Sequence, residues 1–109
     1  MALLTVQNIS LTGLTPTFTA ADSLGDEFPN DGNAFLVVKN DGASDITVTI
    51  DSQKPCSYGY DHDVTVTVPA GSEKWIGPFP QNRFNDTNGR VQVSYSDVTS
   101  VTVAVVEVE

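Results

Sequence analysis

Apolar and polar residues alternate along much of the chain with a period of two, the spacing at which side chains point to opposite faces of a β-strand. Ile46, Val48 and Ile50 alternate with threonine and aspartate, which predicts a strand with one face on a core and the other in water. Residues 64–68 show the same alternation of valine and threonine. The hydrophobic pattern therefore predicts a chain built mainly of β-strands.

Turn residues divide the chain at intervals of about 8–12 residues, the spacing typical of a β-sandwich or barrel. The predicted strands span residues 4–11, 15–19, 33–40, 45–51, 64–68, 73–77, 90–95 and 98–108. Asp41-Gly42 lies between two alternating runs, which predicts a hairpin joining residues 33–40 to residues 45–51. Residues 20–32 are interpreted as a long polar loop, the one place where a short helical turn is expected.

The last predicted strand is apolar on both faces, whereas a strand with one solvated face alternates. One face carries Val101, Val103 and Val105, and the other carries Ala104, Val106 and Val108. We therefore expect one face to meet the core and the other to meet a neighbouring sheet or another subunit.

Composition agrees with the pattern, because 31 of the 109 residues are β-branched (15 Val, 12 Thr and 4 Ile) and such side chains favour strands. A chain of this length forms one domain, residues 1–109. We predict an antiparallel all-β sandwich of about eight strands, jelly-roll-like or immunoglobulin-like. The Cys…Trp…Cys spacing of a true immunoglobulin domain is absent.

The charge is strongly acidic, with 14 acidic and 5 basic residues and a net charge of −9. A field of this sign repels phosphate backbones and anionic lipid, which argues against nucleic-acid and membrane binding. It favours solubility at high concentration or a partner with a basic patch. The N-terminus lacks a basic, then apolar, stretch, so we expect no signal peptide.

Residues capable of catalysis are few. The single histidine, His62, lies between Asp61 and Asp63 and near Cys56, but a catalytic triad requires groups that converge in space. We interpret this segment as a polar loop and Cys56 as small buried packing. We expect no enzymatic activity and no cofactor.

Residues suited to binding a metal ion are also few. One histidine and one cysteine cannot complete the usual zinc ligand set. Residues 22–27 and 85–89 concentrate oxygen ligands in glycine-containing loops, but neither matches the spacing of a calcium loop, and turn chemistry explains both. We predict no metal site, with calcium binding by an acidic loop left open.

An aromatic segment offers a docking surface instead. Trp75 begins a stretch in which Pro78 and Pro80 hold the backbone extended, and Arg83 follows as a cation that could pair with a partner's carboxylate. Core packing is the alternative for Trp75. The predicted partner interface comprises Phe28, Trp75, Pro78, Phe79, Pro80, Arg83, Phe84, Val103 and Val106.

Several segments resemble a family of small head proteins of tailed bacteriophages, the capsid decoration or cement proteins. The resemblance extends from about Leu11 to Val108, whereas residues 51–63 depart from it and look like a variable loop. The segments are residues 28–32 (Phe-Pro-Asn-Asp-Gly), 35–40, 42–44, 46–50, 68–71, 76–80 (Ile-Gly-Pro-Phe-Pro), 91–95 and 98–105.

This resemblance implies a jelly-roll protein, made in the host cytoplasm, that binds the major capsid protein on the outer surface of the virion. It also implies a homo-oligomer, with a trimer favoured, that stabilises the shell by bridging capsomers, and it brings no catalytic residues. The alternatives are an immunoglobulin-like adhesion module and a carbohydrate-binding β-sandwich that uses Trp75, Tyr58 and Tyr60 as a sugar platform.

Overall fold

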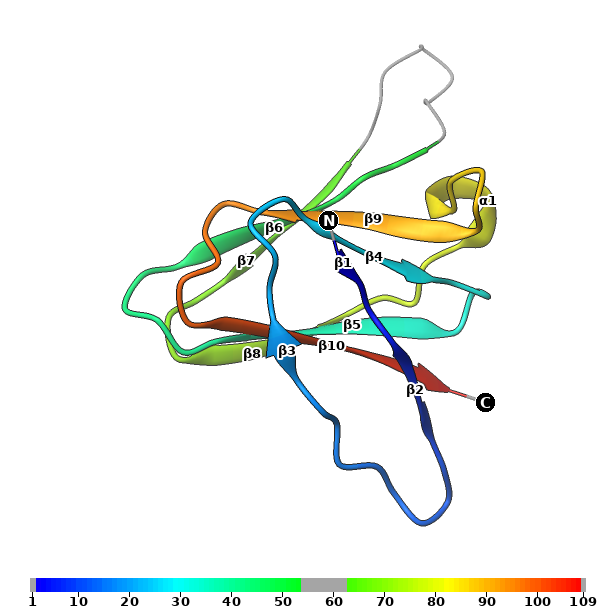
Figure 1. Ribbon diagram of the computed structural model, residues 1–109, viewed down its shortest axis with the longest axis horizontal. Helices are drawn as coiled ribbons and strands as arrows, with labels where there is room; N and C mark the ends of the chain where they lie inside the picture. The colour runs from blue at the N-terminus through cyan, green and yellow to red at the C-terminus, as the bar shows by residue number, and fades with distance from the viewer. Residues whose placement is uncertain (1, 54–62, 109) are drawn as a thin grey trace.

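The computed structural model describes residues 2–53 and 63–108, which form two β-sheets packed face to face (Figure 1). The strands are β1 (Ala2–Leu3), β2 (Val6–Ile9), β3 (Thr19–Ala20), β4 (Asp26–Pro29), β5 (Ala34–Asn40), β6 (Ile46–Ile50), β7 (Val64–Val68), β8 (Ser72–Ile76), β9 (Arg90–Tyr95) and β10 (Val101–Val108). The only helix in the described residues, α1 (Gln81–Phe84), is a single turn. The all-β sandwich predicted from the alternating pattern is confirmed.

The strand order is that of a jelly roll. Sheet A has the order β1-β4-β9-β6-β7, and sheet B has the order β2-β10-β5-β8 with β3 also paired to β10. When β3 to β10 are numbered 1 to 8, the sheets become 2-7-4-5 and 1-8-3-6, which is the strand order of an eight-stranded jelly roll. Every pair within this set of eight is antiparallel. An immunoglobulin domain has a different order.

The N-terminal segment departs from the antiparallel prediction. It divides into β1, which pairs in parallel with β4 of sheet A, and β2, which pairs in parallel with β10 of sheet B. Between them Leu4 turns its side chain into the core, and its backbone N–H donates to the Glu27 carbonyl oxygen at 2.8 Å. The segment therefore crosses from one sheet to the other and closes one side of the sandwich.

The predicted hairpin at Asp41-Gly42 is wrong, because β5 lies in sheet B and β6 lies in sheet A. The buried side chain of Asn40 holds this crossover. Its Nδ2 donates to the carbonyl oxygens of Ser44 at 2.8 Å and Val68 at 3.1 Å, and its Oδ1 accepts from the Gly42 N–H at 3.0 Å. These bonds direct the chain toward the opposite sheet.

Two further local predictions fail. Strand β4 lies inside the stretch interpreted as a polar loop, and the helical turn occurs at Gln81–Phe84 instead. Most of the predicted strand at residues 15–19 is irregular, with only Thr19 entering β3.

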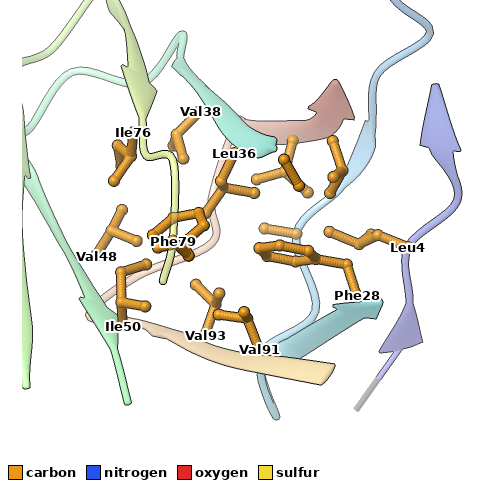
Figure 2. Packing of buried hydrophobic residues seen from close by; sticks show 14 of the residues in the cluster. Leu4, Phe28, Leu36, Val38, Val48, Ile50, Ile76, Phe79, Val91 and Val93 are labelled. Atoms are coloured by element: carbon orange, nitrogen blue, oxygen red, sulfur yellow. The ribbon is translucent and has the colours of Figure 1, made fainter. Parts of the chain in front are cut away.

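Side chains from both sheets meet in one main core (Figure 2). Phe79, from the segment after β8, lies between the sheets, with its ring centroid 5.7 Å from that of Phe28 and 5.6 Å from that of Phe84. In β6 the predicted inward residues, Ile46 and Val48 among them, are buried while the intervening threonines are partly exposed. The period-two pattern thus identified the inner face of this strand correctly.

A second, smaller cluster lies on the outer face of sheet B. Val37, Ala104 and Val106 are almost fully buried there. They are covered by Ile9, Leu14 and Phe18, from β2 and from the loop between β2 and β3. We call residues 10–18 of this loop the arm. It is the blue loop that extends away from both sheets in Figure 1.

Among the described residues, no helix has the length and apolar character needed to cross a bilayer.

Candidate contact surfaces

The structure divides the nine predicted interface residues into two groups. The side chains of Phe28, Phe79, Phe84, Val103 and Val106 are at most 3% exposed. Trp75, Pro78, Pro80 and Arg83 are exposed. The first group is unavailable to a partner in this fold, so the predicted surface is reduced to the second group, which we call the rim.

Phe79 shows why the prediction failed. Pro78 and Pro80 lie at the surface, as a rigid extended segment suggests, but the residue between them points inward. Its backbone carbonyl oxygen accepts a 2.9 Å hydrogen bond from Nδ2 of Asn30, which also donates to Oδ1 of Asn85 at 2.8 Å. The segment is therefore anchored to the sandwich, and Phe79 contributes to the core.

Within the rim, Trp75 is the largest exposed apolar group. It is 50% exposed and pairs with Val37 across β5 and β8, which places it on the outer face of sheet B. Its Nε1 donates to the Glu73 carboxylate at 3.3 Å. The guanidinium of Arg83 lies 4.8 Å from the centre of the Phe84 ring, so the cation is fixed close to the sandwich.

The two faces of the last strand are both apolar, and the same chain covers both except at Val108, which is 44% exposed. Val103 belongs to the main core, and Val106 belongs to the second cluster beneath the arm. The expectation that a second subunit covers one face is therefore corrected for Val106, because Leu14 and Phe18 already pack against its cluster.

The acidic loop at residues 85–89 is a turn held by its own carboxylate. Asp86 accepts from the backbone N–H groups of Asn88 at 2.8 Å and Arg90 at 3.1 Å, and from Nε2 of Gln92 at 2.7 Å. Burial favours the neutral acid, but these hydrogen bonds and the charge of Arg90 outweigh it and lower the pKa of Asp86 below its ordinary value. The loop is therefore explained by turn chemistry, as the sequence suggested.

The other acidic loop spreads its carboxylates in different directions. Oδ1 of Asp22 accepts from the Leu24 N–H at 2.9 Å, which closes a turn. Glu27 points to the outer face of sheet A, where it forms a 2.7 Å ion pair with Arg90. Asp26 is fully buried and accepts a 2.7 Å hydrogen bond from the Tyr95 hydroxyl. Asp26 and Glu27 thus point to opposite faces of sheet A.

In the part of the chain that the structure describes, no three histidine, cysteine, aspartate or glutamate side chains gather as a metal site. The predictions about Cys56, Asp61 and His62 fall outside the described residues, as do those about Tyr58 and Tyr60.

A second surface was missed by the sequence reasoning, although a simple signal marks it. The first 21 residues contain no aspartate, glutamate, lysine, arginine or histidine, so all 14 acids lie beyond residue 21. In the fold, this charge-free stretch comprises β1, β2, the arm and β3. We call residues 2–21 the neutral face.

The neutral face contains both a groove and a projection. The groove has a volume of about 470 Å³, and no charged residue lines it. Residues 2–5 form part of its wall, Thr17 and Thr19 line it from the arm and β3, and residues 103–105 of β10 also contribute. At the far end of the arm, Leu11 is fully exposed.

In comparisons with family models, curated proteins and solved structures, no match to this chain was found. The resemblance to capsid decoration proteins therefore stays a prediction.

Proposed function

We propose that this chain is a non-enzymatic decoration protein, which binds the outer surface of a tailed-bacteriophage capsid and stabilises the shell by bridging capsomers. The observation that carries the proposal is where the family-like segments lie. They fall on β4, β5, β6, β9 and β10, which include the central strands of both sheets, and on the segments that follow β5, β7 and β8. The likeness thus follows the sandwich itself rather than one surface loop.

The physical character of the surface supports the same function. A net charge of −9 keeps free copies soluble before they assemble and favours a basic partner surface. The rim supplies a half-exposed tryptophan on the outer face of sheet B and a guanidinium on the helical turn, and Trp and Arg are among the residue types that dominate interface energetics. A fold can host many functions, so the proposal depends on the surface as well as on the jelly roll.

The test is co-purification with particles. Icosahedral particles isolated on a density gradient from the infected cells that make this chain should carry it in a fixed ratio to the major capsid protein. Trp75→Ala should reduce binding to undecorated particles by about tenfold or more without changing the melting temperature. Leu24→Ala, at an exposed leucine outside the rim, is the matched control and should bind like the parent. Particles free of the chain, while it remains soluble in the same cells, would contradict the function.

Carbohydrate binding is the second candidate, because Trp75 is exposed on a sheet face with the Glu73 carboxylate beside it. An exposed aromatic ring with an adjacent polar group is suited to stacking on a sugar. Calorimetric titration with an oligosaccharide panel, which measures the heat of binding, distinguishes the two. A saturable heat change that Trp75→Phe alters would favour the sugar-binding function.

A further inference from the structure

The neutral face is an electrostatic exception on this molecule. The chain carries 14 acidic side chains and a net charge of −9, and none of its charged side chains comes from residues 2–21. Charged residues of other strands border this face: Nζ of Lys39 lies 4.8 Å from the centre of the Phe18 ring at the base of the arm, and Glu27 and Glu107 are the strand partners of Leu3 and Asn8. The side chains of the face itself are apolar groups, hydroxyls and amides.

The lack of charge determines which partner suits this face. Two copies that approach through acidic surfaces repel each other, and like charges brought together at a contact cost several kcal/mol. A basic partner would gain most from the acidic surfaces and least from a neutral one. Another copy of the same chain gains most from the neutral face, because the groove lining and the arm carry no charged side chain.

The shape of the face also suits a copy of itself. The groove of about 470 Å³ is within the range of sites that hold small ligands, roughly 300–1,000 Å³. Leu3, which lines it, is 56% exposed, and Leu11 at the arm tip is fully exposed. Each copy therefore presents an apolar projection and an apolar recess, which is what a head-to-tail contact between copies requires.

The arm is held in position before any contact is made. The amide of Gln7 pairs with the backbone of Thr17, accepting from its N–H at 2.8 Å and donating to its carbonyl oxygen at 2.9 Å. At the tip, the Gly13 N–H donates to the Ser10 carbonyl oxygen at 3.0 Å. Leu14 and Phe18 fix the arm to sheet B through the second cluster. A preorganised arm loses less conformational entropy when it binds.

We propose that the neutral face is the surface through which copies of this chain associate, with the arm tip of one copy lying in the groove of the next. This inference deepens the proposed function by naming its self-contact surface, and it leaves the rim for the shell. It concerns the isolated protein, so measurements of self-association test it separately from measurements of particle binding.

The test is the mass of the full chain in solution, measured by sedimentation equilibrium over a concentration series. The parent should associate, and Leu11→Asp and Leu3→Asp should each weaken association by about tenfold or more. Leu24→Asp is the matched control: Leu24 is 76% exposed but lies outside the neutral face, so the same change in charge should leave association unaltered. Thermal melts check that all three variants fold.

Salt provides an independent readout. Because the contact contains no ion pairs while the remaining surfaces repel, added NaCl should strengthen association by screening the repulsion. Weaker association at higher NaCl concentration would overturn the proposal. So would a Leu24→Asp variant whose association is weakened as much as that of Leu11→Asp. A parent that stays monomeric up to about 1 mM also overturns it. If that monomer binds particles through Leu11, the face belongs to the shell contact instead.

Discussion

At the residue scale, the most unusual group is the carboxyl of Asp26, which is fully buried in a sheet. Its Oδ2 accepts from the Tyr95 hydroxyl at 2.7 Å and from the Asp22 N–H at 3.3 Å. Its Oδ1 has no hydrogen-bond partner among the described residues. Burial, together with the hydrogen bond and the negative charge of Asp26, raises the pKa of Tyr95 above its usual range. The two side chains therefore depend on each other.

Tyr95→Phe should lower the free energy of unfolding at pH 7 by about 1–3 kcal/mol, because it leaves the buried Asp26 carboxyl with one donor fewer. A folded-state pKa above the unfolded value of about 10 means that the stabilisation by the neutral phenol is complete below pH 10. It is lost as the pH rises beyond 10. Urea unfolding at pH 7 and pH 10.5 should show that the difference in free energy of unfolding between parent and variant is smaller at the higher pH. A difference that is zero at pH 7, or that does not change with pH, would contradict this coupling.

At the element scale, the crossovers and anchored segments decide the topology. The same tripeptide, Asn-Asp-Gly, follows β4 and β5, and in each case the asparagine Oδ1 accepts from the glycine N–H at 3.0 Å. Each asparagine Nδ2 then bonds a distant carbonyl oxygen, that of Phe79 or that of Val68. Gly77, between β8 and Phe79, has a φ of 129° and lies against the backbone of β5.

Gly77→Ala should destabilise the fold by about 3 kcal/mol. Its Cβ would lie 2.9 Å from the Ala34 carbonyl oxygen, and the positive φ adds strain. Gly71→Ala is the matched control, because Gly71 also has a positive φ, 74°, but has open space around the added atom. It should cost only about 1–2 kcal/mol. Chemical denaturation of both variants measures the difference, and equal losses would refute the steric argument.

The same elements show what the sequence could and could not predict. The inward positions of β6 were predictable, because alternation is a local property of the strand. The partners of β5 and β6 were not, because an Asp-Gly turn between two amphipathic strands suits a hairpin as well as a crossover. What decides between them is the contact of Asn40 with Val68, 28 residues away.

The contact surfaces also combine features set by local sequence with features set by contacts between distant residues. The surface position of Pro78 and Pro80 was predicted, but the burial of Phe79 depends on Asn30, 49 residues earlier. That Val106 is covered by Leu14 depends on the pairing of β2 with β10. The neutral face, in contrast, is visible in the sequence as 21 consecutive residues without a charged side chain. Only the fold shows that β1, β2, the arm and β3 lie together at the surface.

At the scale of the whole molecule, strands far apart in the chain are joined in both sheets. β2 pairs with β10, and β4 pairs with β9. Such pairings must close long loops before any contact compensates for the lost entropy. The molecule is therefore a sandwich dominated by non-local contacts.

Refolding should accordingly take milliseconds to seconds, the range of all-β sandwiches. Stopped-flow circular dichroism after dilution from urea measures it. A refolding time in microseconds would show that local turns, rather than the pairing of β10 with its distant partners, limit the rate.

The position of β10 also affects the protein during its synthesis. This strand is bonded to β2, β3 and β5, so nothing joins β2 and β3 to the β5–β8 pair of sheet B until the ribosome has released residues 101–108. Until then the nascent chain carries β2, β3 and β5 with open edges and with Val37 uncovered by its neighbours on β10. Exposed edges and apolar surface are what chaperones bind and what promotes aggregation. In the cell, the yield of soluble protein should therefore depend on how quickly translation reaches the final strand.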